Sequence, residues 1–204
     1  MPNAQGFDYF YGAPLHNGFT RTIEGSRFRM QLMRQNKVLD QSIDQSEMDQ
    51  VTKLYTEEAV KFIQDSAKGD KPFMLYLAHT MAHVVIGATD PFRGSSRGGL
   101  YGDVIEELDW SAGEVIKALK QAKVDDNTLM VFTSDNGPWI EQQLKGKGGN
   151  DAHYGTSGPL RGAKMMTWEG GVRVPTIVRW PGVVPAGKDC SEPATIMDLL
   201  PTFA

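Results

Sequence analysis

Residues 129–138, LMVFTSDNGP, place an acidic and an amide side chain directly after an apolar run. The short apolar run predicts a buried strand, and Asp135 and Asn136 follow its end. One interpretation is a tight turn, because Asp-Asn-Gly-Pro is a strong turn sequence. The other is a metal site, since carboxylate and amide oxygens bind hard divalent cations and ligands of α/β proteins bind at strand ends. This stretch alone leaves both interpretations open.

The composition excludes several classes of partner. The chain has 204 residues, of which 40% are hydrophobic, and this is enough for one domain with a sizeable core. Its 21 Lys and Arg against 25 Asp and Glu give a net charge of -4, so we expect no nucleic-acid partner, and any anion site must be built locally. Cys190 is the single cysteine, which excludes an internal disulfide framework. No apolar run approaches the ~18 residues that cross a bilayer, so we expect no membrane span.

Apolar periodicity predicts helices that alternate with strands. Residues 1–45 show no sustained period, and we expect them to be mostly irregular. The segment 104–119 is the clearest amphipathic helix, and Thr56 is a suitable N-cap for another helix that stops at Gly69. The expected elements are helices at residues 56–69, at residues 104–119 and from residue 194, and strands at residues 73–78, 129–133 and 175–180. This alternation predicts an α/β fold with a mainly parallel sheet flanked by helices.

A parallel sheet would bring distant polar residues together. If strands 73–78 and 129–133 are parallel, the residues that follow each strand lie at the same edge of the sheet. The residues that would share this rim are His79, His83, Asp135 and Asn136. The long segment 139–174 is rich in glycine and polar residues, carries Lys164 and returns to the same edge. Connections of more than about 15 residues without regular structure are often functional.

Four stretches of the chain follow one another in a recognisable order. They are GFDYFYG near the start, PFMLYLAHTMAH at 72–83, VFTSDNGP at 131–138 and GPLRGAKMMTWEGGVRVPTIVRWPG at 158–182. Together they resemble the sulfatase family, the arylsulfatase-like enzymes that use formylglycine. YGDVIEELDWSAGEVIKAL is similar to the helix that the family has between the second and third stretches. The resemblance implies an alkaline-phosphatase-like fold and a sulfuric ester hydrolase that acts on a small-molecule or glycan sulfate ester.

The resemblance also implies roles for individual residues. Asp135 and Asn136 match the family's late pair of calcium ligands, whose oxygens help to hold Ca²⁺ against the sulfate. Lys164 matches the lysine that contacts the sulfate. His83 matches the histidine that meets the substrate near the bridging oxygen, where it could assist the leaving group. The resemblance therefore favours a metal site over a plain turn.

Other polar residues receive simpler interpretations. We expect His79 to be a satisfied histidine at the rim, and His16 and His153 to lie in solvated loops. Glu169 and Arg173 are expected to form an ion pair or backbone anchors that support the loop of the lysine.

The chain departs from the family at the nucleophile. The family makes formylglycine from a cysteine in a Cys-X-Pro/Ala-X-Arg motif, whereas Cys190 lies in CSEPA, so we interpret it as an ordinary cysteine. The family's first two aspartate ligands and its C-terminal subdomain have no counterpart here either. The resemblance thus implies that residues 1–204 are an internal fragment of a catalytic domain, truncated at both ends. Since Ca²⁺ takes about 6 to 8 oxygen ligands, we expect weak metal binding and no catalysis from this polypeptide alone.

Two other functions stay open. A phosphate or phosphonate ester hydrolase of the same superfamily uses the same metal and anion chemistry. A non-catalytic protein that binds anions or glycans on this scaffold would also lack the nucleophile. The resemblance implies a periplasmic, extracellular or lysosomal location, while the particular sulfate ester and the oligomeric state are not determined by the residues.

Overall fold

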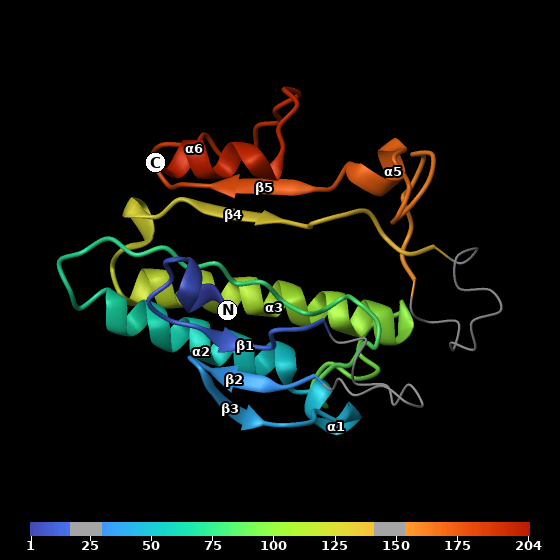
Figure 1. Ribbon diagram of the computed structural model, residues 1–204. Helices are drawn as coiled ribbons and strands as arrows, with labels where there is room; N and C mark the ends of the chain where they lie inside the picture. Colours follow the sequence, from blue (N-terminus) through green and yellow to red (C-terminus); the bar gives the residue numbers. More distant parts are fainter. Residues whose placement is uncertain (17–29, 141–153) are drawn as a thin grey trace. The chain divides into compact units, whose positions relative to one another are not determined.

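The computed structural model of the chain describes residues 1–16, 30–140 and 154–204. These residues form two compact units. The first unit contains the described residues from Met1 to Ala122, and the second contains those from Lys123 to Ala204. Each unit has one antiparallel sheet of its own (Figure 1).

The first unit combines a small sheet with two long packed helices. Its elements are η1 (Pro2–Gln5), β1 (Tyr11–Gly12), β2 (Leu32–Arg34), β3 (Lys37–Asp40), α1 (Gln45–Met48), α2 (Val51–Ser66) and α3 (Gly99–Gln121). The sheet has the order β1-β2-β3 with both pairs antiparallel, so the prediction that residues 1–45 are mostly irregular missed it. These strands are two, three and four residues long, which is too short for an alternating pattern to be recognised.

Helix α2 begins five residues before the predicted N-cap. The turn before it is α1, which starts with a capping box between Asp44 and Glu47, and the chain then continues into α2 from Val51. Thr56 lies inside the helix and is buried. Its hydroxyl donates to the Thr52 carbonyl at 2.7 Å and lies 2.6 Å from the Ser111 hydroxyl of α3. The predicted cap is therefore a buried polar contact between two helices.

Helix α3 extends the predicted helix 104–119 at both ends and packs against α2 (Figure 1). The apolar core beside it consists of Met30, Ile43, Met48, Val51, Tyr55, Met81, Ile86, Ala88 and Val104. Three polar residues of α3, Asp103, Glu107 and Ser111, are also at most 2% exposed. Ile105, which the periodicity places on the apolar face, is 43% exposed. The buried face of α3 thus includes polar residues, and it does not coincide with the apolar face that the periodicity predicts.

The segment 73–78 is not assigned as a strand, although its side chains alternate. Phe73, Leu75 and Leu77 are half-buried, whereas Met74 and Tyr76 are exposed. A continuous apolar run suggested burial on both faces, but the alternation shows burial on one face only. The predicted strand at 73–78 is therefore not observed, and its parallel pairing with 129–133, a segment of the other unit, stays a prediction.

The second unit is built on one antiparallel pair of strands. Its elements are η3 (Asp125–Asn127), β4 (Met130–Thr133), α5 (Glu169–Val172), β5 (Thr176–Arg179), η4 (Ile196–Asp198) and α6 (Leu199–Phe203). Strands β4 and β5 lie where they were predicted, and they pair from Met130 opposite Arg179 to Thr133 opposite Thr176. The helix predicted from residue 194 begins at Ile196. Helices and sheets together agree with the α/β class, while the sheets that the structure describes are antiparallel.

A bidentate ion pair fastens the end of β5 to the turn before β4. The two Arg179 guanidinium nitrogens donate to the two Asp125 carboxylate oxygens at 2.7 and 2.8 Å. This planar fork is the strongest form of an arginine–carboxylate contact. The next residue, Trp180, donates its indole N–H to the Asp126 carbonyl at 3.1 Å. Both contacts lie at the end of the strand pair opposite the long connection between β4 and β5.

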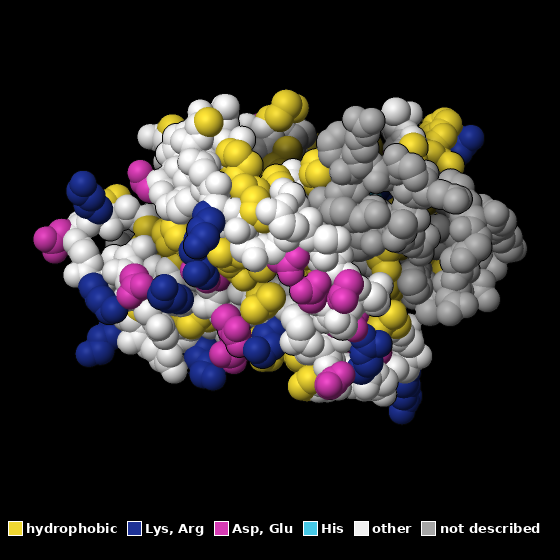
Figure 2. Space-filling view, turned by 60° about the horizontal axis from the view of Figure 1, so that its bottom comes forward, with side chains coloured by type: hydrophobic (Ala, Val, Ile, Leu, Met, Phe, Trp, Pro, Cys, Tyr) yellow, Lys and Arg dark blue, Asp and Glu magenta, His cyan; other side chains and the backbone are white. Residues whose placement is uncertain are grey.

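Charges of both signs are mixed on the surface. Figure 2 shows lysine and arginine side chains scattered among aspartate and glutamate on the face in view. A continuous basic stripe, the usual sign of nucleic-acid binding, is not what that face presents. Within residues 1–16, 30–140 and 154–204, no helix has the length and apolar character needed to cross a membrane.

His79 lies between the long helices of the first unit rather than at a satisfied rim position. Its Nε2 atom is 3.0 Å from the Ser111 hydroxyl, and its ring stacks on Tyr55 with centroids 6.2 Å apart. Its Nδ1 atom is buried and has no hydrogen-bond partner among the described residues. Burial lowers the pKa of His79 from 6.5 to about 4, because an imidazolium would lose its hydration there.

We predict that this burial makes stability depend on pH. Since the pKa of His79 is lower in the folded than in the unfolded protein, the unfolded protein binds more protons between pH 6.5 and about 4. The free energy of unfolding should therefore fall by up to about 3 kcal/mol as the pH is lowered through this window, and the full contribution should be present above pH 6.5. Urea unfolding at a series of pH values measures this slope. His79→Gln should flatten this slope, and an unchanged slope in His79→Gln contradicts the prediction.

Candidate functional site

The predicted turn and the predicted ligand pair are the same structure. Asp135 and Asn136 form a bend directly after β4. The Ser134 hydroxyl donates to the Asn136 carbonyl at 3.0 Å and closes this bend locally. The Asp135 side chain is exposed and that of Asn136 is half-buried, while Gly137 is fully buried. The bend thus presents a carboxylate at the surface and anchors itself through the glycine.

Glycines join this bend to the segment that contains Lys164. The Gly137 amide donates to the Gly171 carbonyl at 2.9 Å, and the Gly170 amide donates to the Arg161 carbonyl at 2.8 Å. A Cβ atom at Gly137 would overlap the Gly170 carbonyl, and one at Gly170 would overlap the Gly162 carbonyl. Only residues without a side chain allow these backbones to approach so closely. The short helix α5 therefore contributes two glycines to a contact with the bend after β4.

Lys164 is tied to the residues that follow the bend. Its amide donates to the Pro138 carbonyl at 2.9 Å, and its ammonium lies 5.8 Å from the centre of the Trp139 ring. The next residue, Met165, has a φ of 72°, a left-handed conformation that costs about 1–2 kcal/mol for a residue other than glycine. Such strain persists only where the surrounding contacts enforce it, and it is common at functional sites. The lysine thus lies in a fixed, strained loop.

Charged and aromatic side chains brace the outer side of this loop. The Arg161 guanidinium lies 3.6 Å from the centre of the Trp168 ring, which is a cation–π contact. Glu169 and Arg173 form an ion pair at 3.0 Å across one turn of α5, as predicted from the sequence. Both of their side chains are more than half exposed, so this ion pair adds at most about 1 kcal/mol to the free energy of unfolding.

His83 lies in the first unit. Its Nδ1 atom is 2.5 Å from the Val84 carbonyl oxygen, and its ring centre lies 4.9 Å from that of His16. Because a carbonyl oxygen only accepts hydrogen bonds, Nδ1 carries the proton in this contact. His16 was predicted to be a solvated loop residue, and although it is exposed it belongs beside His83. His153 lies outside the described residues.

The predicted site residues are thus brought together only in part. Asp135, Asn136 and Lys164 belong to the second unit, where one set of backbone contacts connects them. Their meeting with His83 of the first unit stays a prediction. The sequence did not point to His16, because a lone histidine in an aperiodic segment carries no signal of its own.

The donor atoms of the bend suit a hard cation. In the parts of the chain that the structure describes, no three His, Cys, Asp or Glu side chains gather into a metal-binding group. Asp135 and Asn136 nevertheless offer a carboxylate and an amide oxygen on adjacent residues, which is the donor chemistry that Ca²⁺ prefers. They fit part of a shell of about 6 to 8 oxygens. Cys190 is an exposed free thiol, as expected of an ordinary cysteine.

Comparison with known proteins identifies the family. The profile of the family described as Sulfatase matches residues 1–204. Human (Homo sapiens) steryl-sulfatase is 38% identical over 173 residues, which are 85% of this chain and 28% of that protein. The chain therefore spans less than a third of the length of this curated relative.

Solved structures extend the likeness to the fold. Ps i-CgsB in complex with k-i-k-neocarrahexaose has a TM-score of 0.79 and 30% identity, covering 100% of this chain and 46% of that one. The PsFucS1 sulfatase from Pseudoalteromonas sp. has a TM-score of 0.76 and 29% identity, covering 92% of this chain and 40% of that one. These neighbours have the alkaline-phosphatase-like fold that was expected from the motifs. With a family match along its whole length and this fold, the chain belongs to the sulfatase family.

Proposed function

We propose that the chain supplies the late metal ligands and the sulfate-binding lysine of a sulfuric ester hydrolase. The observation that carries the proposal is the backbone connection between the Asp135–Asn136 bend and the Lys164 loop. It places a hard-oxygen pair and an ammonium on one glycine-packed support. A sulfate monoester is an anion that both a bound cation and an ammonium attract.

The chemistry of each side chain fits this role. At about 4 Å from a sulfate oxygen in a partly dry site, the Lys164 ammonium would contribute up to about 4 kcal/mol before the cost of desolvation is subtracted. Asp135 and Asn136 would hold Ca²⁺, which when bound polarises the sulfate oxygens. The His83 imidazole, whose Nδ1 atom donates to the Val84 carbonyl, would assist the leaving group at the bridging oxygen of the ester.

Residues 1–204 do not contain the nucleophile that the family uses. Cys190 stands in CSEPA, without the small residue and the arginine of the formylglycine motif. Side chains that bind and orient a sulfate cannot replace an activated nucleophile. We therefore propose that this polypeptide alone binds sulfate esters weakly and does not hydrolyse them.

The relatives support a proposal for the class of substrate. One relative is named a steryl-sulfatase, and one solved structure holds a neocarrahexaose, which is a glycan. We propose a sulfate monoester on a small molecule or a glycan as the ligand of the site. A periplasmic, extracellular or lysosomal location stays part of this proposal.

We predict that Lys164→Ala abolishes most of the sulfatase activity. In the protein encoded by the complete reading frame around residues 1–204, kcat/KM for 4-nitrophenyl sulfate should fall by about 100-fold or more, because one charge-stabilising contact to the transition state is lost. Lys188→Ala, an exposed lysine of the same unit, is the control and should leave the rate unchanged. Equal rates in both variants would refute the role of Lys164. A complete protein that binds sulfate esters without turnover would establish the non-catalytic alternative.

We predict that Gly170→Ala separates the lysine loop from the metal bend. The added methyl group overlaps the Gly162 carbonyl, so the backbone must shift, at a cost of about 1–3 kcal/mol in the free energy of unfolding. Calcium titration followed by calorimetry should show weaker binding than in the unchanged chain. Gly113→Ala is the matched control, since a Cβ there meets open space on α3 and should stabilise the helix. Unchanged calcium binding in Gly170→Ala would show that the glycine contact does not support the site.

A further inference from the structure

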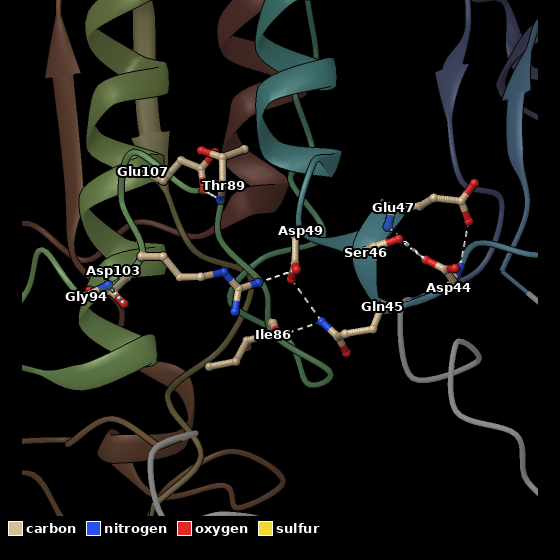
Figure 3. Close-up of polar contacts among 11 residues, drawn as sticks. Asp44, Gln45, Ser46, Glu47, Asp49, Ile86, Thr89, Gly94, Asp103 and Glu107 are labelled. Atoms are coloured by element: carbon tan, nitrogen blue, oxygen red, sulfur yellow. Dashed lines mark hydrogen bonds and ion pairs between the residues drawn. The ribbon is translucent and has the colours of Figure 1, made fainter.

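The segment after His83 is held in place although it has no regular structure. Residues 86–96 contain no helix or strand, yet Ile86, Ala88 and Thr89 are at most 4% exposed. Backbone N–H groups buried outside helices and sheets need acceptors from elsewhere. Figure 3 shows two such acceptors, the carboxylates of Glu107 and Asp103 on α3.

Glu107 holds the middle of the segment. One of its carboxylate oxygens accepts the Thr89 amide at 3.0 Å, and the other accepts the Thr89 hydroxyl at 2.9 Å (Figure 3). Glu107 is 0% exposed. Burial raises the pKa of Glu107, while the two Thr89 donors oppose this rise and nearby Asp49 adds to it. Both carboxylate oxygens of Glu107 thus accept hydrogen bonds from one residue of the segment, Thr89.

Asp103 holds the end of the segment from one turn earlier on α3. Its two oxygens accept the Gly94 amide at 2.8 Å and the Ser96 amide at 2.9 Å. Asp103 is 2% exposed and lies on the same helix face as Glu107, four residues before it. Both of its donors are backbone groups that cannot turn into acceptors. An asparagine at this position would leave one of the two amides without an acceptor.

Contacts from α1 hold the start of the segment. Gln45 donates through its side-chain amide to the Ile86 carbonyl at 3.3 Å and to Asp49 at 3.1 Å. Asp49 also forms an ion pair with Arg93. A Cβ at Gly87 would overlap the Asp49 carboxylate, so the backbone there lies directly against α1. The segment is therefore fixed at its start, middle and end.

Two buried carboxylates cost free energy that an apolar core would not require. Among the described residues, their hydrogen bonds go to residues 89–96, so they contribute to the shape of this segment. His83 lies three residues before Ile86, and the Val84 carbonyl that fixes its ring belongs to the chain between them. We propose that Asp103 and Glu107 are positioning residues that act through this segment on the His83 imidazole. The catalytic side of this inference rests on the proposed role of His83.

The test uses Asp103→Asn, with Glu114→Gln, a surface residue of the same helix, as the control. In the 204-residue chain, loss of a charge-assisted hydrogen bond should speed amide hydrogen exchange at Gly94 and Ser96 about 10- to 100-fold. The NMR titration of the His83 imidazole should shift as well, whereas Glu114→Gln should change neither. Unchanged exchange and an unchanged His83 titration in Asp103→Asn would overturn the proposal.

A second variant covers the case in which Asp103→Asn fails to fold. Thr89→Val keeps the shape and the amide of Thr89 but removes the hydroxyl that Glu107 accepts, and it should shift the His83 titration in the same direction. If His83 titrates as in the unchanged chain, the proposal fails.

Kinetics separate this inference from the proposed function. In the protein from the complete reading frame, Asp103→Asn should lower kcat about tenfold and change KM less than about threefold, because Lys164 still binds the sulfate. A change in KM alone, with kcat unchanged, would contradict a positioning role for Asp103. If Asp103→Asn moves the His83 titration while His83→Ala leaves hydrolysis unchanged, the positioning holds and the proposed role of His83 fails.

Discussion

The close approach of Gly137 to Gly170 and Gly171 is the constraint on which the candidate site depends. Two segments far apart in the sequence can share one support only because no side chain stands between their backbones. The contact gives the bend after β4 its anchor and gives the Lys164 loop its position. A turn sequence and a ligand pair are therefore not alternatives here, since the turn is what presents the oxygens.

In the first unit, carboxylates rather than glycines hold an irregular segment of backbone in place. Its irregular segment after His83 satisfies buried amides with the carboxylates of Asp103 and Glu107. In both units the residues proposed for chemistry lie on backbone that belongs to no helix or strand. Such backbone keeps one conformation only when its donors and acceptors are paired by the elements around it. Helix α3 and strand β4 are thus supports as much as parts of the core.

Sequence patterns predicted long periodic elements and missed what tertiary contacts decide. Helix α3 was found because its apolar residues repeat, and strands β4 and β5 were found because each is a short apolar run. The start of α2 was misplaced because Thr56 suits a cap as well as a buried hydroxyl contact. The antiparallel pairing of β4 with β5 was not predicted, because the direction of pairing depends on the partner strand rather than on the apolar pattern of either strand. The burial of Asp103 and Glu107 had no signal in hydrophobic periodicity, although their i, i+4 spacing beside the apolar stripe could have suggested it. Individual site residues came from motif resemblance, and their convergence with His83 is still to be measured.

The fork between Arg179 and Asp125 has a consequence for how such a protein can diversify. It lies at the end of the strand pair opposite the connection from β4 to β5, so the register of the pair is fixed there by residues outside that connection. Lengthening a connection whose ends are already fixed costs little conformational entropy. We therefore expect insertions to be tolerated in the parts of this connection outside the bend and the Lys164 loop, so that a family could change the shape around its ligand while leaving the strands untouched.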